Sequence, residues 1–133
     1  DKRAINRTWE LVKYEVNGID STELINYNGN EDYKKISFFV VEKSPLRINL
    51  TTNGEVGLQT SFIDNNKKMV CYNSSSNYPM AKICNIYQSS ICYRMIFCPE
   101  IVTTEWTIDK LTRSEFNIHT SLTNNYVIKL KKI

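Results

Sequence analysis

A tryptophan near each end of the chain, each in a strand-like context, constrains the fold most strongly. Trp9 lies in the stretch 7–18 and Trp106 in the stretch 104–111. Between them, short apolar runs are separated by turn residues, and little of the sequence has a helical period. This layout is typical of a small closed or nearly closed β-barrel, whose interior can hold a ligand.

Turn signals divide the chain into strands. Asn53-Gly54 is the clearest hairpin signal, because both residues tolerate the positive φ of a type I′ turn. The stretch 20–33 predicts a long polar loop with one helical turn near 21–25, and 73–79 predicts a second loop. Besides a first strand around Trp9, the expected strands cover 35–41, 46–50, 56–62, 68–73, 80–87, 91–98, 102–109, 115–121 and 126–130. The prediction is one all-β domain over residues 1–133, an antiparallel up-and-down β-barrel of about eight to ten strands.

Alternation along the clean strands assigns the side chains that face the interior. The stretch 91–98 is less regular, with Tyr93, Met95 and Phe97 on one face and Cys92, Arg94, Ile96 and Cys98 on the other. The predicted inward residues of the clean strands are Leu46, Ile48, Leu50, Val56, Leu58, Phe62, Phe116, Ile118, Tyr126, Ile128 and Leu130.

None of these inward residues carries a charge, and an unpaired buried charge is very costly. A ligand in the barrel would therefore be small and largely apolar, such as a lipid fragment, oriented by tyrosine hydroxyls. The predicted ligand-binding residues are Ile48, Leu58, Phe62, Tyr93, Met95, Phe116 and Tyr126.

Composition narrows the class of protein. Hydrophobic residues make up 41% and charged residues 23% of the 133 residues, as in ordinary globular proteins. The net charge of +3 matches Lys129, Lys131 and Lys132 alone, and no basic run marks a nucleic-acid surface. No apolar run reaches the ~18 residues that cross a bilayer. The chain begins with Asp1, which indicates a removed signal peptide or a trimmed chain.

Catalytic chemistry is not expected. His119 is the only histidine, and its outward strand position predicts a surface residue. The sequence has no nucleophile elbow, no Gly-rich phosphate loop and no metal-ligand spacing, so neither a metal nor a cofactor is expected. The competing class is a barrel enzyme that uses a pocket residue such as Cys92 or Tyr93.

Four cysteines fall within one stretch, at Cys71, Cys84, Cys92 and Cys98, and allow three pairings. On an extended strand Cys92 and Cys98 would lie roughly 20 Å apart, too far to bond each other. Disulfides would then join neighbouring strands or a strand and a loop, and export would favour them. Buried thiols are the open alternative.

The two ends of the chain resemble bacterial lipocalin-like lipoproteins. The similarity lies in Trp9-Glu10-Leu11 with the stretch 14–20, and in the stretches 106–111, 115–118 and 126–130. Arg7 stands where true lipocalins place the Gly of Gly-x-Trp, which argues against a vertebrate-type lipocalin and leaves the bacterial type open. The resemblance implies an up-and-down barrel with an apolar interior. It also implies export to the cell envelope and a lipid anchor ahead of the barrel, which would be its membrane attachment.

Two functions follow from this interpretation. The first is a monomeric binding protein that holds a small apolar ligand, with Trp9 and Trp106 as structural residues closing one end. A ligand-stacking role is the alternative for these tryptophans. The second function is a protein–protein interaction module with a filled core, binding through loops 20–33 and 73–79. An apolar cavity of about 300 Å³ or more would favour the first function and a solid core the second.

Overall fold

The computed structural model describes residues 7–26, 35–40, 46–50, 55–73, 91–92 and 95–133. These ranges contain eleven strands and one short 3-10 turn, η1 (Thr22–Leu24), and no α-helix. The prediction of an all-β chain is therefore confirmed. The strands are β1 (Arg7–Val16), β2 (Ile19–Asp20), β3 (Ile25–Asn26), β4 (Lys35–Val40), β5 (Leu46–Leu50), β6 (Glu55–Ile63), β7 (Lys68–Asn73), β8 (Ile91–Cys92), β9 (Thr103–Leu111), β10 (Glu115–Ser121) and β11 (Asn125–Lys132).

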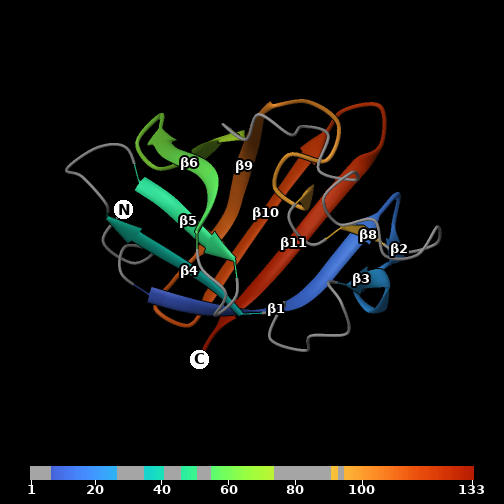
Figure 1. Ribbon diagram of the computed structural model, residues 1–133, viewed down its shortest axis with the longest axis horizontal. Coiled ribbons are helices and arrows are strands. Elements are labelled where there is room, and N and C mark those ends of the chain that lie inside the picture. The colour runs from blue at the N-terminus through green and yellow to red at the C-terminus, as the bar shows by residue number, and fades with distance from the viewer. Residues whose placement is uncertain (1–6, 27–34, 41–45, 51–54, 74–90, 93–94) are drawn as a thin grey trace.

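One antiparallel sheet contains nine of these strands (Figure 1). Its order is β11, β10, β9, β7, β6, β5, β4, β1 and β2, so successive long strands are neighbours. β11 also pairs with β1, in a register that runs from Trp9 opposite Lys132 to Val16 opposite Tyr126. The strongly curved sheet thus brings its first and last long strands side by side. The remaining pair, β3 and β8, is short and parallel.

Local turn chemistry explains two of the connections. Asn17 and Gly18 have φ values of 53° and 79°, the left-handed conformation that a tight hairpin between β1 and β2 requires. The turn at Asp64-Asn65-Asn66 joins β6 to β7, and all three residues have positive φ. The strands that flank Asn53-Gly54, β5 and β6, pair antiparallel as the hairpin signal predicted; residues 51–54 lie outside the described ranges.

Alternation assigns the inner face correctly on the last two strands. Phe116 and Ile118 of β10 are buried, as are Tyr126, Ile128 and Leu130 of β11. Leu58 of β6 is also buried, whereas Phe62 is partly buried against the core. The side chains of the other predicted inward residues, Leu46, Ile48, Leu50 and Val56, lie outside the described part of the chain.

The predicted strand over 91–98 is wrong from Met95 onward. β8 ends at Cys92, and residues 95–98 form a turn in which the Cys98 N–H donates to the Met95 carbonyl at 3.1 Å. Ile96, Phe97 and Cys98 are all buried, although successive side chains of a strand point to opposite faces. Pro99 follows directly and has no N–H for a ladder. The extended spacing assumed for Cys92 and Cys98 therefore does not exist.

Candidate functional site

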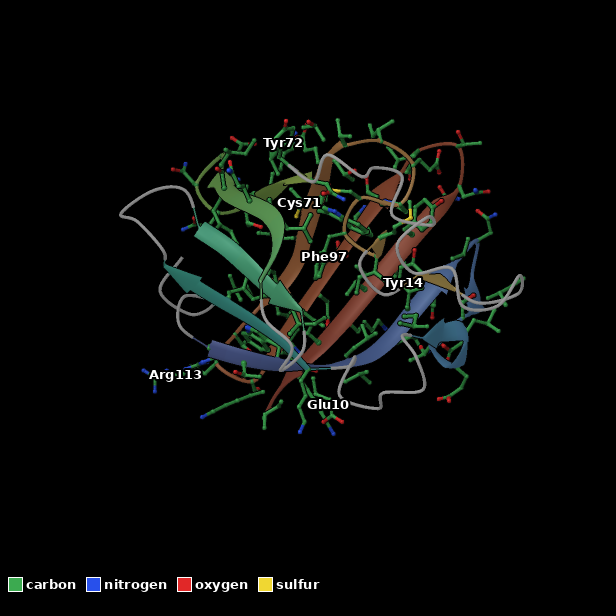
Figure 2. The ribbon with its side chains drawn as sticks, viewed as in Figure 1. Glu10, Tyr14, Cys71, Tyr72, Phe97 and Arg113 are labelled. Atoms are coloured by element: carbon green, nitrogen blue, oxygen red, sulfur yellow. The ribbon has the colours of Figure 1, made fainter. Side chains whose placement is uncertain are left out.

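The inner face of the sheet is packed with aromatic rings. Phe97 meets Phe38 edge-on with ring centroids 6.3 Å apart, and Phe38 lies 5.6 Å from Phe116. Phe116 also contacts Trp9 at 5.6 Å and Phe62 at 6.3 Å. Figure 2 shows Phe97 in the middle of the molecule, inside the curve of the sheet. Rings from β1, β4, β6, β10 and the 95–98 segment thus pack against one another on the inner face.

The predicted ligand-binding residues have separate positions in this interior. Phe62 and Phe116 are in contact, and Leu58 is buried. Tyr126 stacks on Tyr14, with ring centroids 6.2 Å apart. Met95 is half-buried at the start of the 95–98 turn.

For two of the predicted ligand-binding residues, the structure does not describe the side chain. Ile48 pairs with Leu58 through the backbone, but its side chain lies outside the described residues, as does Tyr93 entirely. Sequence reasoning missed the central place of Phe97. The available signal was the run Ile96-Phe97-Cys98 ahead of Pro99, which is apolar on both strand faces.

Both tryptophans are fully buried, but their indole N–H groups differ. Trp106 Nε1 donates to the Phe97 carbonyl oxygen at 2.9 Å, which fixes the 95–98 turn in the interior. Trp9 Nε1 has no hydrogen-bond partner among the described residues. The Arg7 guanidinium lies 5.8 Å from the centre of the Trp9 ring and donates to the Arg113 carbonyl at 2.7 Å. Arg7 thus covers the Trp9 ring.

Glu100 attaches the segment that follows Phe97 to the turn between β10 and β11. One carboxylate oxygen accepts the Thr123 N–H at 3.1 Å, and the other accepts the Asn124 N–H at 3.0 Å and the Tyr126 hydroxyl at 2.8 Å. These donors, led by the Asn124 backbone N–H, lower the pKa of Glu100 to about 2. The ionised carboxylate is therefore the form that holds this end of the sheet together.

Tyr14 and Tyr126 present phenol groups at the same end. Burial is the main reason that the pKa of Tyr14 is raised, and the neighbouring Tyr126 and Glu100 raise it further. Its hydroxyl remains neutral at any physiological pH. A neutral phenol is suited to orienting a polar group, and it does not serve as a base.

Two of the four cysteines are buried thiols that lie close together. Cys98 Sγ approaches the Cys71 carbonyl oxygen at 3.6 Å, and Cys71 Sγ lies 3.7 Å from Thr60 Oγ1. Burial raises the pKa of Cys71 well above its ordinary value and that of Cys98 to about 12. Thiols of this kind are poor nucleophiles. Cys84 and the side chain of Cys92 lie outside the described residues.

A second feature is a depression of about 320 Å³ beside the β6–β7 turn. Its lining is polar, apart from two half-buried side chains of β9. At its edge, Asp109 holds His119 through Nδ1, at 2.8 Å from Oδ1 and 2.7 Å from Oδ2. His119 is partly exposed, as its outward position predicted. The depression is lined by Asn65, Asn66, Lys67, Ile108, Asp109, Lys110 and Leu111.

No arrangement of three or more His, Cys, Asp or Glu side chains that could hold a metal ion occurs in the described ranges. Nor do these ranges contain a helix long and apolar enough to cross a membrane.

In comparisons with known proteins, no family model, curated protein or solved structure matches the chain.

Proposed function

We propose that this chain is a closed, lipocalin-like up-and-down β-barrel that acts as an exported binding protein. The pairing of β11 with β1 supports closure, because it joins the two ends of the antiparallel order. The resemblance of both termini to bacterial lipocalin-like lipoproteins supports a place in the cell envelope. In this proposal the barrel is a monomer anchored by a lipid ahead of β1, and it catalyses no reaction.

The activity that the geometry supports best is binding of a protein partner at one end of the barrel. The observation that carries this proposal is the ring packing around Phe97, which occupies the inner face beside Phe38 and Phe116. A ligand that took the place of the Phe97 ring would lose this packing, and removing such a ring from a core costs roughly 3–5 kcal/mol. Binding outside the barrel requires no such displacement.

Exposed apolar side chains identify the end that would be used. Tyr72, Ile101 and Val102 are 45%, 50% and 40% exposed. They are neighbours, because the Asn73 N–H donates to the Val102 carbonyl at 2.8 Å and Tyr72 pairs with Thr103. The predicted contact loop 73–79 begins at this apolar patch, and residues 74–79 lie outside the described part of the chain. Exposed apolar side chains that lie together are a feature of protein-binding surfaces.

A site-specific photo-crosslinker at position 101, in cells that produce the protein natively, tests this proposal. We expect a discrete adduct with one protein that disappears when Tyr72 and Val102 are both replaced by serine. A crosslinker at Ile133, which is exposed at the end of the chain, is the matched control and should give no such adduct. Equal adducts from positions 101 and 133 would contradict a specific surface.

The second candidate function is retention of a small apolar molecule inside the barrel. Trp9 Nε1 favours it, because this buried donor has no acceptor among the described residues and a ligand carbonyl or hydroxyl would supply one. Native mass spectrometry of the purified protein, followed by titration with a fluorescent fatty acid, tests this function. A co-purified molecule, or probe binding that weakens in Trp9→Phe, would support it. A native mass equal to that of the chain alone, together with no probe binding, would exclude ligand retention.

A further inference from the structure

Two backbone irregularities lie next to each other where β9 passes the β6–β7 turn. Asp64, Asn65 and Asn66 follow one another with φ values of 57°, 57° and 65°, a left-handed conformation that Asp and Asn tolerate singly but rarely adopt in succession. Opposite this turn, the pairing of β9 with β10 shifts register between Asn117 and Ile118, which marks a bulge in the ladder. The Ile108 N–H donates to the Lys67 carbonyl at 2.8 Å and joins the two features.

The depression lies between these irregularities, and three of its side chains have unused hydrogen-bonding groups. The Lys67 ammonium and the carboxamides of Asn65 and Asn66 make no hydrogen bond or ion pair with any described residue. The two charged neighbours on β9 are already engaged. Lys110 pairs with Glu115, and Asp109 pairs with His119.

We propose that this depression binds a monosaccharide that carries one anionic group, either a phosphate or a carboxylate. The Lys67 ammonium supplies a charge-assisted donor for the anion. Each carboxamide has both a donor and an acceptor, the combination that sugar hydroxyls require. Ile108 and Leu111 are half-buried and provide an apolar floor for the face of the ring. The volume of about 320 Å³ lies at the small end of ligand sites.

Strain distinguishes this turn from an ordinary solvated hairpin. A two-residue Asn-Gly turn would join β6 to β7 without three successive left-handed residues. Strained backbone persists where the surroundings hold it, and it is concentrated at functional sites. The hydrogen bond from the Ile108 N–H to the Lys67 carbonyl holds this turn against β9, and both asparagines line the depression. This site is separate from the barrel interior and from the apolar patch at Tyr72, so it does not depend on either proposed function.

Amide NMR spectra of the ¹⁵N-labelled protein, titrated with glucose 6-phosphate, glucuronate, glucose or inorganic phosphate, test the proposal. We expect saturable shifts of the Asn65 and Asn66 carboxamides with at least one sugar anion. Lys67→Gln should weaken that binding by about tenfold, the loss expected for one charged contact. Lys129→Gln removes another exposed lysine, on β11, and should leave the affinity unchanged.

The four probes separate the possible sources of binding. A response to glucose 6-phosphate alone assigns a phosphate, and a response to glucuronate alone assigns a carboxylate. A response of equal strength to inorganic phosphate would overturn the sugar component of the proposal. The absence of local shifts up to about 20 mM probe, or equal binding by Lys67→Gln, would overturn the site itself.

Discussion

The two tryptophans allow the contribution of one buried hydrogen bond to be measured within a single protein. Both rings are 0% exposed, but Trp106 Nε1 donates to the Phe97 carbonyl at 2.9 Å, whereas Trp9 Nε1 has no described partner. Replacing each residue by phenylalanine removes the same atoms from the core. The variant Trp106→Phe also removes a hydrogen bond and leaves the buried Phe97 carbonyl without its donor. Trp9→Phe removes a buried donor without such a loss.

The magnitude follows from that difference. Both substitutions lose ring volume, and this cost is similar in two buried positions. A buried polar group left without its partner costs about 1–3 kcal/mol. We therefore expect Trp106→Phe to lower the free energy of unfolding by about 1–3 kcal/mol more than Trp9→Phe does. In a domain of this size, each kcal/mol corresponds to about 4 °C in Tm.

Denaturant unfolding monitored by circular dichroism measures both variants, with the m-value checked for constancy. Equal losses would refute the reasoning, because the hydrogen bond to Phe97 would then contribute nothing to stability. A larger loss for Trp9→Phe would mean that its indole N–H is satisfied. Alanine variants test the structural role itself, with an expected cost of roughly 3–5 kcal/mol each. Loss of ligand binding without loss of stability would instead indicate ring stacking on a ligand.

Three further outcomes follow from the site geometry. Glu100→Gln should lower Tm at pH 7, because an amide oxygen replaces a carboxylate that accepts three hydrogen bonds; an unchanged Tm would contradict that role. Because the pKa of Glu100 is lowered, its contribution to the free energy of unfolding is present above pH 4.5 and is lost as pH falls toward about 2. Tm measured as a function of pH should therefore show this loss in the wild type and lack it in Glu100→Gln. Cys71 and Cys98 should react with a thiol reagent at pH 8 only after unfolding, and rapid labelling of the native protein would refute their burial.

Local signals made the last two long strands predictable from sequence. β10 and β11 alternate cleanly and are joined by a short turn, so the burial of Phe116, Ile118 and Ile128 follows from parity alone. The left-handed turn at residues 64–66 follows from the tolerance of Asn and Asp for positive φ. The matching contexts of Trp9 and Trp106 indicated strands at both ends, but the register of β1 against β11 depends on contacts more than 100 residues apart.

The 95–102 segment was not predictable in the same way. Its conformation depends on distant partners, namely Trp106 Nε1 of β9 for the Phe97 carbonyl and the Asn124 N–H of the β10–β11 turn for Glu100. Parity assigned Phe97 and Ile96 to opposite faces, whereas both are buried, because a turn follows no two-residue period. The depression beside Lys67 was missed for a related reason, since the bulge opposite it arises from pairing between β9 and β10.

Phe97 connects the interior of the protein to its exposed end. Its ring fills the core beside Phe38, and its carbonyl is held by Trp106. Five residues later, Val102 is exposed and accepts the Asn73 N–H that places it beside Tyr72. The same short segment therefore contributes a ring to the core and presents apolar side chains to solvent. A molecule that displaced the Phe97 ring would also shift the apolar patch five residues away, so binding in the interior and binding of a partner at this end would then be energetically coupled.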